Sequence, residues 1–339
     1  MLRAGVSFFY VTAPQKKRDM TQVWLWVGFS VLILGMLAID LGVLNRHSRV
    51  TTVKEAARWT VVVVLVAAAF NAWIFYARGP QAGLEFTAGY LIELALSVDN
   101  IFVFILIFKY FKVPAAFQHR VLFWGIFGAL FMRGGMIAAG WLLIERFHWI
   151  IYVFGAFLIF TGIKMARSDD LEVHPEHNPV LKLIRRVVPL APNYDGQRFF
   201  THAFWGTRHR RLATPLFVVL VMVETTDLVF AIDSIPAIFA VTRDPFLVFT
   251  SNVFAILGLR SMYFLLAGVI DKFHYLKLGL AVVLSFVGVK MLITYFHIEV
   301  PIGASLGIVA GILSLSVAGS LLFPEKKETG ASADESSGD

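Results

Sequence analysis

Ionisable side chains stand in two strongly apolar stretches of the chain. One stretch reads YLIELALSVDNIFVF (residues 90–104) and the other reads VETTDLVFAIDSIPAI (residues 223–238). Their acids are Glu93, Asp99, Glu224, Asp227 and Asp233. An unpaired charge is costly in apolar surroundings, so we expect these carboxylates to bind a cation or to pair with a basic side chain.

The donor atoms of these stretches suit a hard metal ion. Besides the carboxylates, they offer an amide and a hydroxyl oxygen, and oxygen ligands favour Mg²⁺, Ca²⁺ or Mn²⁺ over copper. The chain has no Cys, which excludes a thiolate zinc site and a thiol redox centre. We therefore expect a site for a divalent cation, bound as a substrate and with no permanent cofactor, made by Glu93, Asp99, Asn100, Asp227, Asp233 and Ser234.

The spacing of the acids limits how they can share an ion. In a helix, the six-residue separations of Glu93 from Asp99 and of Asp227 from Asp233 correspond to about 9 Å and about 120°. Two acids of one unbroken helix therefore cannot bind the same ion. Either the equivalent acids of the two stretches meet, Asp99 with Asp233, or a helix is broken.

Proline favours a break in the second stretch only. Pro236 has no N–H, and its ring displaces the carbonyl of Ile232, next to Asp233. A carbonyl freed in this way can bind a cation where it faces a cavity. The first stretch has no matching proline.

Six further ionisable residues are candidates for additional acidic groups at the site or for groups that contact its ligands from outside. Asp40 and the two lysines of this group lie near the ends of apolar segments, where reaching the polar boundary is the alternative explanation. The two arginines are alternative partners for the acids in structural ion pairs. Together with Glu93, Asp99, Asp227 and Asp233, the charges of these six residues sum to −2, which one divalent cation would neutralise. The six residues are Asp40, Glu224, Arg133, Arg260, Lys164 and Lys290.

The composition is that of a polytopic membrane protein. Hydrophobic residues make up 58% of the chain and the mean hydropathy is +0.73, whereas soluble domains are about 45–50% apolar. The net charge of +7 follows from basic cytoplasmic loops and does not require a nucleic acid partner. Segments of about 20 apolar residues predict nine membrane-spanning helices. They cover residues 23–44, 59–77, 86–108, 121–144, 149–166, 213–240, 246–270, 276–296 and 302–323.

An internal repeat relates residues 86–166 to residues 213–296. The two acidic stretches match so that Glu93 corresponds to Asp227, Asp99 to Asp233 and Asn100 to Ser234. Three more matches follow in the same order: ALFMRGGM with ILGLRSMY, IERFHW with IDKFHY, and FTGIKMA with FVGVKML. Each repeat holds three spans, so the two copies should cross the membrane in opposite directions, which is typical of transporters.

The remaining segments are expected to lie outside the membrane. Residues 1–20 are interpreted as an N-terminal extension, with Met20 as the start of the working protein, residues 21–324 as the transmembrane domain, and residues 325–339 as a disordered tail. In the loop 167–212, His174 and His177 are candidate metal ligands or part of a solvated loop. Residues 178–190 predict a short amphipathic helix on the inner membrane surface.

These motifs resemble the TerC family of integral membrane proteins, and its Alx-type members in particular. The resemblance covers residues 21–323 and is carried by AIDLGV, YLIELALSVDNIFVF, YVFGAFLIFTGIKMA and the long run from Val223 to Gly268. It implies a metal-ion exporter with manganese as the leading substrate. It also brings a tellurium-resistance label, proposals of a redox role, and a role in supplying metal to secreted enzymes. The acidic positions of the family match the six site residues already selected.

The sequence thus predicts a nine-helix transporter that exports Mn²⁺ through a carboxylate site at the middle of the membrane, with protons as a candidate counter-ion. One alternative is a membrane partner that delivers metal to secreted or redox proteins without transporting it. The other is a membrane oxidoreductase, which is disfavoured because the spans show no haem-type His pair and no nucleotide-binding loop. An oxyanion substrate would require a cationic site, whereas the central site is acidic. The oligomeric state is left open.

Basic residues predict the orientation of the chain in the plasma membrane. With the N-terminus outside and the C-terminus in the cytoplasm, 19 Lys and Arg residues lie on the inner side and 7 on the outer side. Reporter domains fused after residues 112, 195 and 330 are therefore expected to be cytoplasmic. An external signal from residue 195 would contradict both this orientation and the opposed repeats.

Overall fold

In the computed structural model, the chain is described for residues 15–42, 52–167, 179–205, 208–268, 274–296, 298 and 300–322. Its elements are α1 (Gln15–Gly42), α2 (Val53–Arg78), α3 (Pro80–Tyr110), α4 (Ala115–Arg146), α5 (Ile150–Arg167), α6 (Pro179–Val187), β1 (Phe200–Trp205), β2 (Arg208–Ala213), α7 (Pro215–Phe239), α8 (Pro245–Leu266), α9 (His274–Ile293), the 3-10 turn Thr294–Phe296, and α10 (Ile302–Leu322). Helix α1 belongs to one compact unit, and all later elements belong to a second.

The fold is that of an all-α polytopic membrane protein. Within the described ranges, eight helices are long and apolar enough to cross a bilayer, namely α2 to α5 and α7 to α10. The first expected span falls on α1, whose described apolar part, Val23–Ile39, is shorter than the other eight. Helix α1 begins at Gln15, and the proposed start at Met20 stays a prediction.

Local sequence signals set several helix ends. The Thr52 hydroxyl accepts a hydrogen bond from the Glu55 N–H, and the Glu55 carboxylate accepts one from the Thr52 N–H, which satisfies free donors at the start of α2. Gly79 alone separates α2 from α3 and has a φ of 91°, a conformation that glycine adopts without steric cost. Asp244 caps α8 and is followed by proline at the first helical position.

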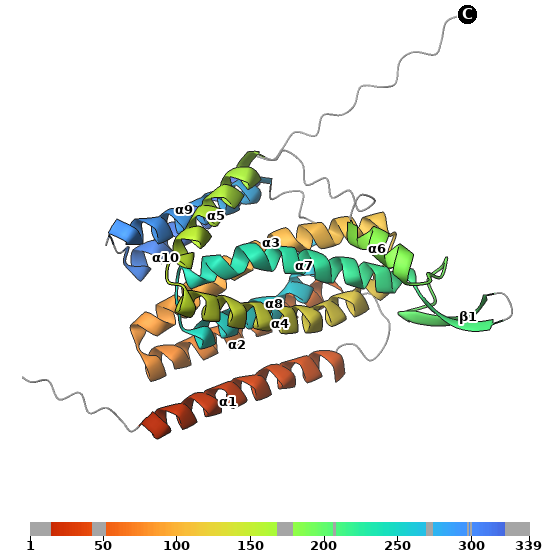
Figure 1. The fold of residues 1–339 in the computed structure, drawn as a ribbon, viewed down its shortest axis with the longest axis horizontal. Helices are drawn as coiled ribbons and strands as arrows, with labels where there is room; N and C mark the ends of the chain where they lie inside the picture. Colours follow the sequence, from red (N-terminus) through yellow and green to blue (C-terminus); the bar gives the residue numbers. More distant parts are fainter. Residues whose placement is uncertain are drawn as a thin grey trace, which may run out of the picture. The chain divides into compact units, whose positions relative to one another are not determined.

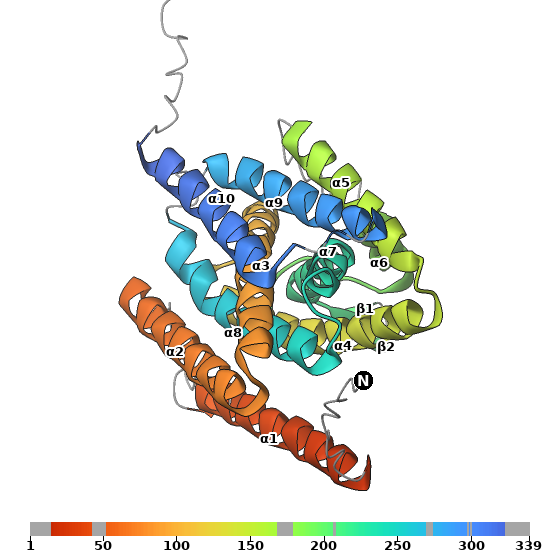
Figure 2. The ribbon, with the colours of Figure 1, turned by 90° about the vertical axis from the view of Figure 1, so that its left-hand side faces the viewer.

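Helices α3 and α7 lie in the middle of the second unit, with the other spans around them (Figures 1 and 2). Helix α3 packs against α2, α7, α8 and α10, and α7 packs against α3, α4 and α5. The two acidic stretches lie on these two central helices. The elements therefore carry the candidate site residues to the inside of the helix bundle.

The helices of the two predicted repeats pack against their sequence equivalents. Helix α3 contacts α7, α4 contacts α8, and α5 contacts α9. Helix α3 also contacts α8, and the equivalent pair, α4 and α7, is in contact as well. This is the pattern that a two-fold relation between α3–α5 and α7–α9 would give. The opposed orientation of the repeats in the membrane stays a prediction.

The contact between α5 and α9 has the same reciprocal form. A Cβ placed on Gly162 would lie 2.7 Å from the carbonyl oxygen of Ala281, and one placed on Gly288 would lie 2.6 Å from that of Gly155. In the repeat alignment, Gly162 corresponds to Gly288 and Gly155 to Ala281, so the two contacts are equivalent. Small residues allow helix backbones in a membrane to approach closely.

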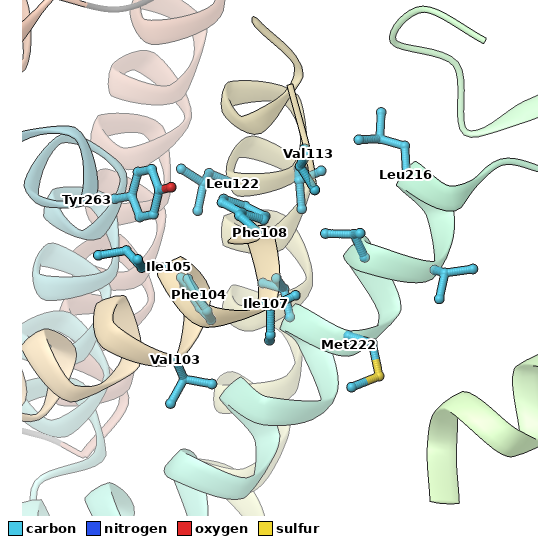
Figure 3. Packing of buried hydrophobic residues seen from close by; sticks show 14 of the residues in the cluster. Val103, Phe104, Ile105, Ile107, Phe108, Val113, Leu122, Leu216, Met222 and Tyr263 are labelled. Atoms are coloured by element: carbon cyan, nitrogen blue, oxygen red, sulfur yellow. The ribbon is translucent and has the colours of Figure 1, made fainter. Parts of the chain in front are cut away.

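A large apolar cluster fills one end of the bundle. The cluster includes Phe108 of α3, Leu122 of α4, Met222 of α7 and Tyr263 of α8, which are labelled in Figure 3, and each is less than 5% exposed. The rings of Phe108 and Tyr263 meet edge to face, with centroids 5.4 Å apart. This packing holds the four helices that carry the candidate site in fixed positions relative to one another.

The segment between the repeats has more structure than the expected loop 167–212. Helix α6 confirms the short helix predicted over 178–190, with Leu181 and Ile184 buried in the apolar cluster. The antiparallel pair β1 and β2 was not predicted. A signal for it exists, because only Gly206 and Thr207 separate the strands, and a Gly-X pair is typical of a two-residue hairpin loop. His174 and His177 lie outside the described residues, as does the expected tail.

Helices α3 and α7 are both continuous through their acidic stretches. Helix α7 includes Pro236 and ends three residues later at Phe239. The proline removes a backbone donor but does not divide the helix. Of the two arrangements left open by the sequence, the structure therefore has the unbroken one, in which equivalent acids of different helices come together.

The close approach of α5 and α9 makes a prediction about stability. We expect Gly288→Ala to destabilise the protein by roughly 1–3 kcal/mol, because the added methyl group meets the Gly155 carbonyl and Ile159 rather than open space. Gly311→Ala in α10 is the matched control, since a Cβ at that position has no neighbour within 4 Å among the described residues. Thermal unfolding of both variants in detergent checks this. Equal melting temperatures would contradict the close packing.

Candidate functional site

The site residues selected from the sequence form two neighbouring centres. Glu93 and Asp227 meet at Arg133, and this group is named the arginine centre. A small cavity next to it is lined by Asp99, Asn100, Asp233 and Ser234, and by Arg133 itself; this is named the acidic cavity. Equivalent acids of α3 and α7 thus come together in both centres.

The arginine centre joins four helices through one guanidinium group. Arg133 of α4 donates from Nε to Asp227 Oδ2 (3.1 Å) and from Nη2 to Asp227 Oδ1 (3.0 Å), a bidentate pair. Its Nη1 contacts Glu93 Oε1 of α3 and lies 3.5 Å from Asn252 Oδ1 of α8. Glu93, Arg133 and Asp227 are at most 3% exposed.

The acidic cavity has a volume of about 10 Å³, room for one water-sized particle. Asp99 and Asn100 come from α3, and Asp233 and Ser234 come from α7. Apolar side chains complete the wall: Leu96, Met165, Phe230 and Leu284. Asp99 and Asp233 are only partly buried, unlike the fully buried acids of the arginine centre. The two centres share Asn100, whose Nδ2 donates to Asp227 Oδ1 (3.3 Å).

Neutral oxygens at the cavity have unused capacity to bind a cation. Asn100 Oδ1 and Ser234 Oγ are buried and have no hydrogen-bond partner among the described residues. An unpaired buried oxygen is costly, and a bound ion would relieve that cost. Within the described ranges, no group of three or more His, Cys, Asp and Glu residues forms a metal cluster. A metal bound here would therefore have two carboxylates together with neutral oxygens as its ligands.

Two lysines and a threonine act on the cavity acids. Thr161 of α5 donates to Asp233 Oδ1 (3.2 Å), and Lys164, one turn further along α5, interacts electrostatically with Asp233. Lys277 of α9 interacts electrostatically with Asp99. Lys164 was among the residues expected at the site, whereas Thr161 and Lys277 were missed. Thr161 could have been found because it is polar and lies three residues before Lys164 in an apolar helix.

Arg260 and Lys290 were also expected at the site, but neither lines the cavity. Arg260 of α8 is buried and interacts electrostatically with His119 of α4. Lys290 interacts with Glu85. The helix α1 includes Asp40, but its side chain is outside the described residues.

Glu224 lies one turn before Asp227 on α7 and packs over Gly128 of α4. A Cβ at position 128 would collide with the Glu224 carboxylate, so a side chain there would displace that carboxylate. Glu224 Oε2 is buried without a hydrogen-bond partner among the described residues. Glu224 thus belongs to the surroundings of the arginine centre and not to the wall of the cavity.

Comparisons with known proteins agree with this architecture. A family model described as "Integral membrane protein TerC family" matches residues 78–328. A Myxococcus xanthus protein named "Uncharacterized membrane protein STKORF319" is 53% identical over 298 residues, which is 88% of this chain and 92% of that protein. An Escherichia coli K12 protein named "Putative membrane-bound redox modulator Alx" is 49% identical over 302 residues, 86% and 92% of the two chains.

A "Uncharacterized membrane protein" of Rickettsia bellii is 39% identical over 298 residues, which covers 88% of this chain and 97% of that protein. No solved structure matches the chain. The matched region includes all spans from α3 to α10 and with them both centres. The chain therefore belongs to the TerC family of integral membrane proteins.

Proposed function

We propose that this protein transports a divalent metal cation across the plasma membrane, with Mn²⁺ as the leading substrate. One observation carries the proposal: Asp99 and Asp233, from equivalent positions of two central helices, line one small cavity with the Asn100 amide and the Ser234 hydroxyl. These hard oxygen donors suit Mn²⁺, Mg²⁺ or Ca²⁺. The choice of Mn²⁺ and the outward direction rest on the family resemblance.

The division into two centres gives the acids different roles. Glu93 and Asp227 form ion pairs with Arg133, so their main role is to hold α3, α4 and α7 together. Asp99 and Asp233 keep their carboxylates at the cavity and supply the charge that a dehydrated divalent ion needs. Lys164 and Lys277 supply positive charge near these acids. This charge would offset the charge of the carboxylates when no metal ion is bound, between transport steps.

The name of the Alx relatives suggests a second function, the modulation of redox balance. This chain has no Cys, so it cannot exchange thiols and disulfides itself. A redox effect would then follow from the metal that it moves or hands to another protein. Purified protein in liposomes, with no partner present, separates transport from metal delivery.

Removing one cavity charge is expected to stop transport without unfolding the protein. In proteoliposomes, Asp99→Asn and Asp233→Asn should each lower Mn²⁺ flux by at least about tenfold, the effect of losing 1.4 kcal/mol of ion binding. Their melting temperatures should stay close to that of the unchanged protein, because a buried amide is less costly than a buried carboxylate. Glu145→Gln is the matched control, since Glu145 is exposed at the end of α4. Undiminished flux in both cavity variants would refute the proposed site.

A charge-removing substitution in the arginine centre should instead lower the stability of the protein. Asp227→Asn leaves Arg133 without the charge of its bidentate partner, and breaking a buried pair typically costs about 3–5 kcal/mol. We therefore expect a clear fall in melting temperature for Asp227→Asn, measured beside Asp233→Asn in the same detergent. If Asp233→Asn were the less stable of the two, the division of roles would be wrong.

A further inference from the structure

Arg133 belongs to both centres. Its guanidinium group binds Glu93 and Asp227, and the same side chain forms part of the wall of the acidic cavity. Arg133 is 1% exposed and is among the largest fully buried side chains of the described chain. A permanent positive charge therefore lies directly beside the position proposed for a divalent cation.

The arginine centre has more oxygen ligands than Arg133 uses. Nε, Nη1 and Nη2 of the guanidinium all have acceptors, whereas Glu93 Oε2 and Asn100 Oδ1 are buried with no hydrogen-bond partner among the described residues. Two carboxylates face one cation, which leaves one uncompensated negative charge. A pair kept only for structure would be expected to satisfy its buried oxygens.

Without its arginine, the centre would be a metal site. Glu93 and Asp227 would offer two carboxylates, and Asn100 would offer an amide oxygen once its bond to Asp227 is rearranged. Together with Asn252 nearby on α8, this set has the same chemistry as the acidic cavity: two acids and neutral oxygens. The guanidinium group occupies the position that a second ion would take.

We propose that Arg133 is a tethered cation that fills a second cation-binding position, formed by Glu93, Asp227 and Asn100, and so limits the carrier to one divalent ion, in the acidic cavity. This inference rests on the proposed function, because the first ion is placed between Asp99 and Asp233. Removing the positive charge leaves a net charge of −2 at the second position, which a divalent ion neutralises.

Counting bound Mn²⁺ tests this directly. Equilibrium dialysis of the purified full chain against Mn²⁺, with the metal measured by elemental analysis, should give one ion per chain for the unchanged protein and two for Arg133→Gln. Arg133→Lys keeps the charge and should bind one. The double variant Arg133→Gln with Asp227→Asn removes a ligand of the second position and should also bind one. One ion in folded Arg133→Gln would overturn the proposal.

If Arg133→Gln folds poorly and its bound ions cannot be counted, its melting temperature provides a second test. The variant should melt at a lower temperature than the unchanged protein without metal and regain most of that difference with saturating Mn²⁺. Millimolar methylguanidinium, which resembles the missing group, should stabilise Arg133→Ala but not the unchanged protein. A variant that neither Mn²⁺ nor methylguanidinium stabilises would show a purely structural arginine and overturn the proposal.

The two proposals fail in distinguishable ways. If the unchanged protein binds no Mn²⁺, the proposed function fails at the acidic cavity, whatever Arg133→Gln does. If the unchanged protein binds one ion and Asp99→Asn binds none, the cavity site stands. A count of one for Arg133→Gln then refutes only the tethered cation.

Discussion

The arrangement of this protein depends on one buried ion pair network, in which the guanidinium of Arg133 holds Asp227 in a bidentate pair and contacts Glu93. Charges at this depth are stable only when they are paired, so the network fixes the relative position of α3, α4 and α7. Asn252 brings α8 into the same network. The acidic cavity is next to it and shares Asn100 and Arg133, so its geometry follows from the position of the network.

The structure places chemically similar acids in two different environments. Fully buried Glu93 and Asp227 are both paired with Arg133, a residue of the chain itself. Partly buried Asp99 and Asp233 instead face a cavity whose neutral oxygens, Asn100 Oδ1 and Ser234 Oγ, have no hydrogen-bond partner among the described residues. The six-residue spacing produces this separation, because it turns the two acids of each helix to different faces at different depths. Each pair of equivalent acids then meets across α3 and α7.

Helices at equivalent positions of the two repeats pack against each other, as the equivalent acids do. Helix α3 contacts α7 at the site, and α5 crosses α9 through the reciprocal contacts of Gly162 and Gly288. Thr161 and Lys164 of α5 act on Asp233, and Lys277 of α9 acts on Asp99. Movement of the α5–α9 pair would therefore change the surroundings of both cavity acids.

The sequence by itself determined the membrane class and eight of the spans. It also selected six polar residues that the structure gathers in the two centres, and it gave the pairing of Asp99 with Asp233 as one of two alternatives. These features depend on local hydrophobicity and on the fixed geometry of a helix, which a sequence contains. Only the tertiary structure decided that α7 continues through Pro236, that Arg133 joins Glu93 to Asp227, and that Lys277 and Thr161 act on the cavity acids. Those facts depend on which helices lie side by side and on their rotation, and long-range packing sets both.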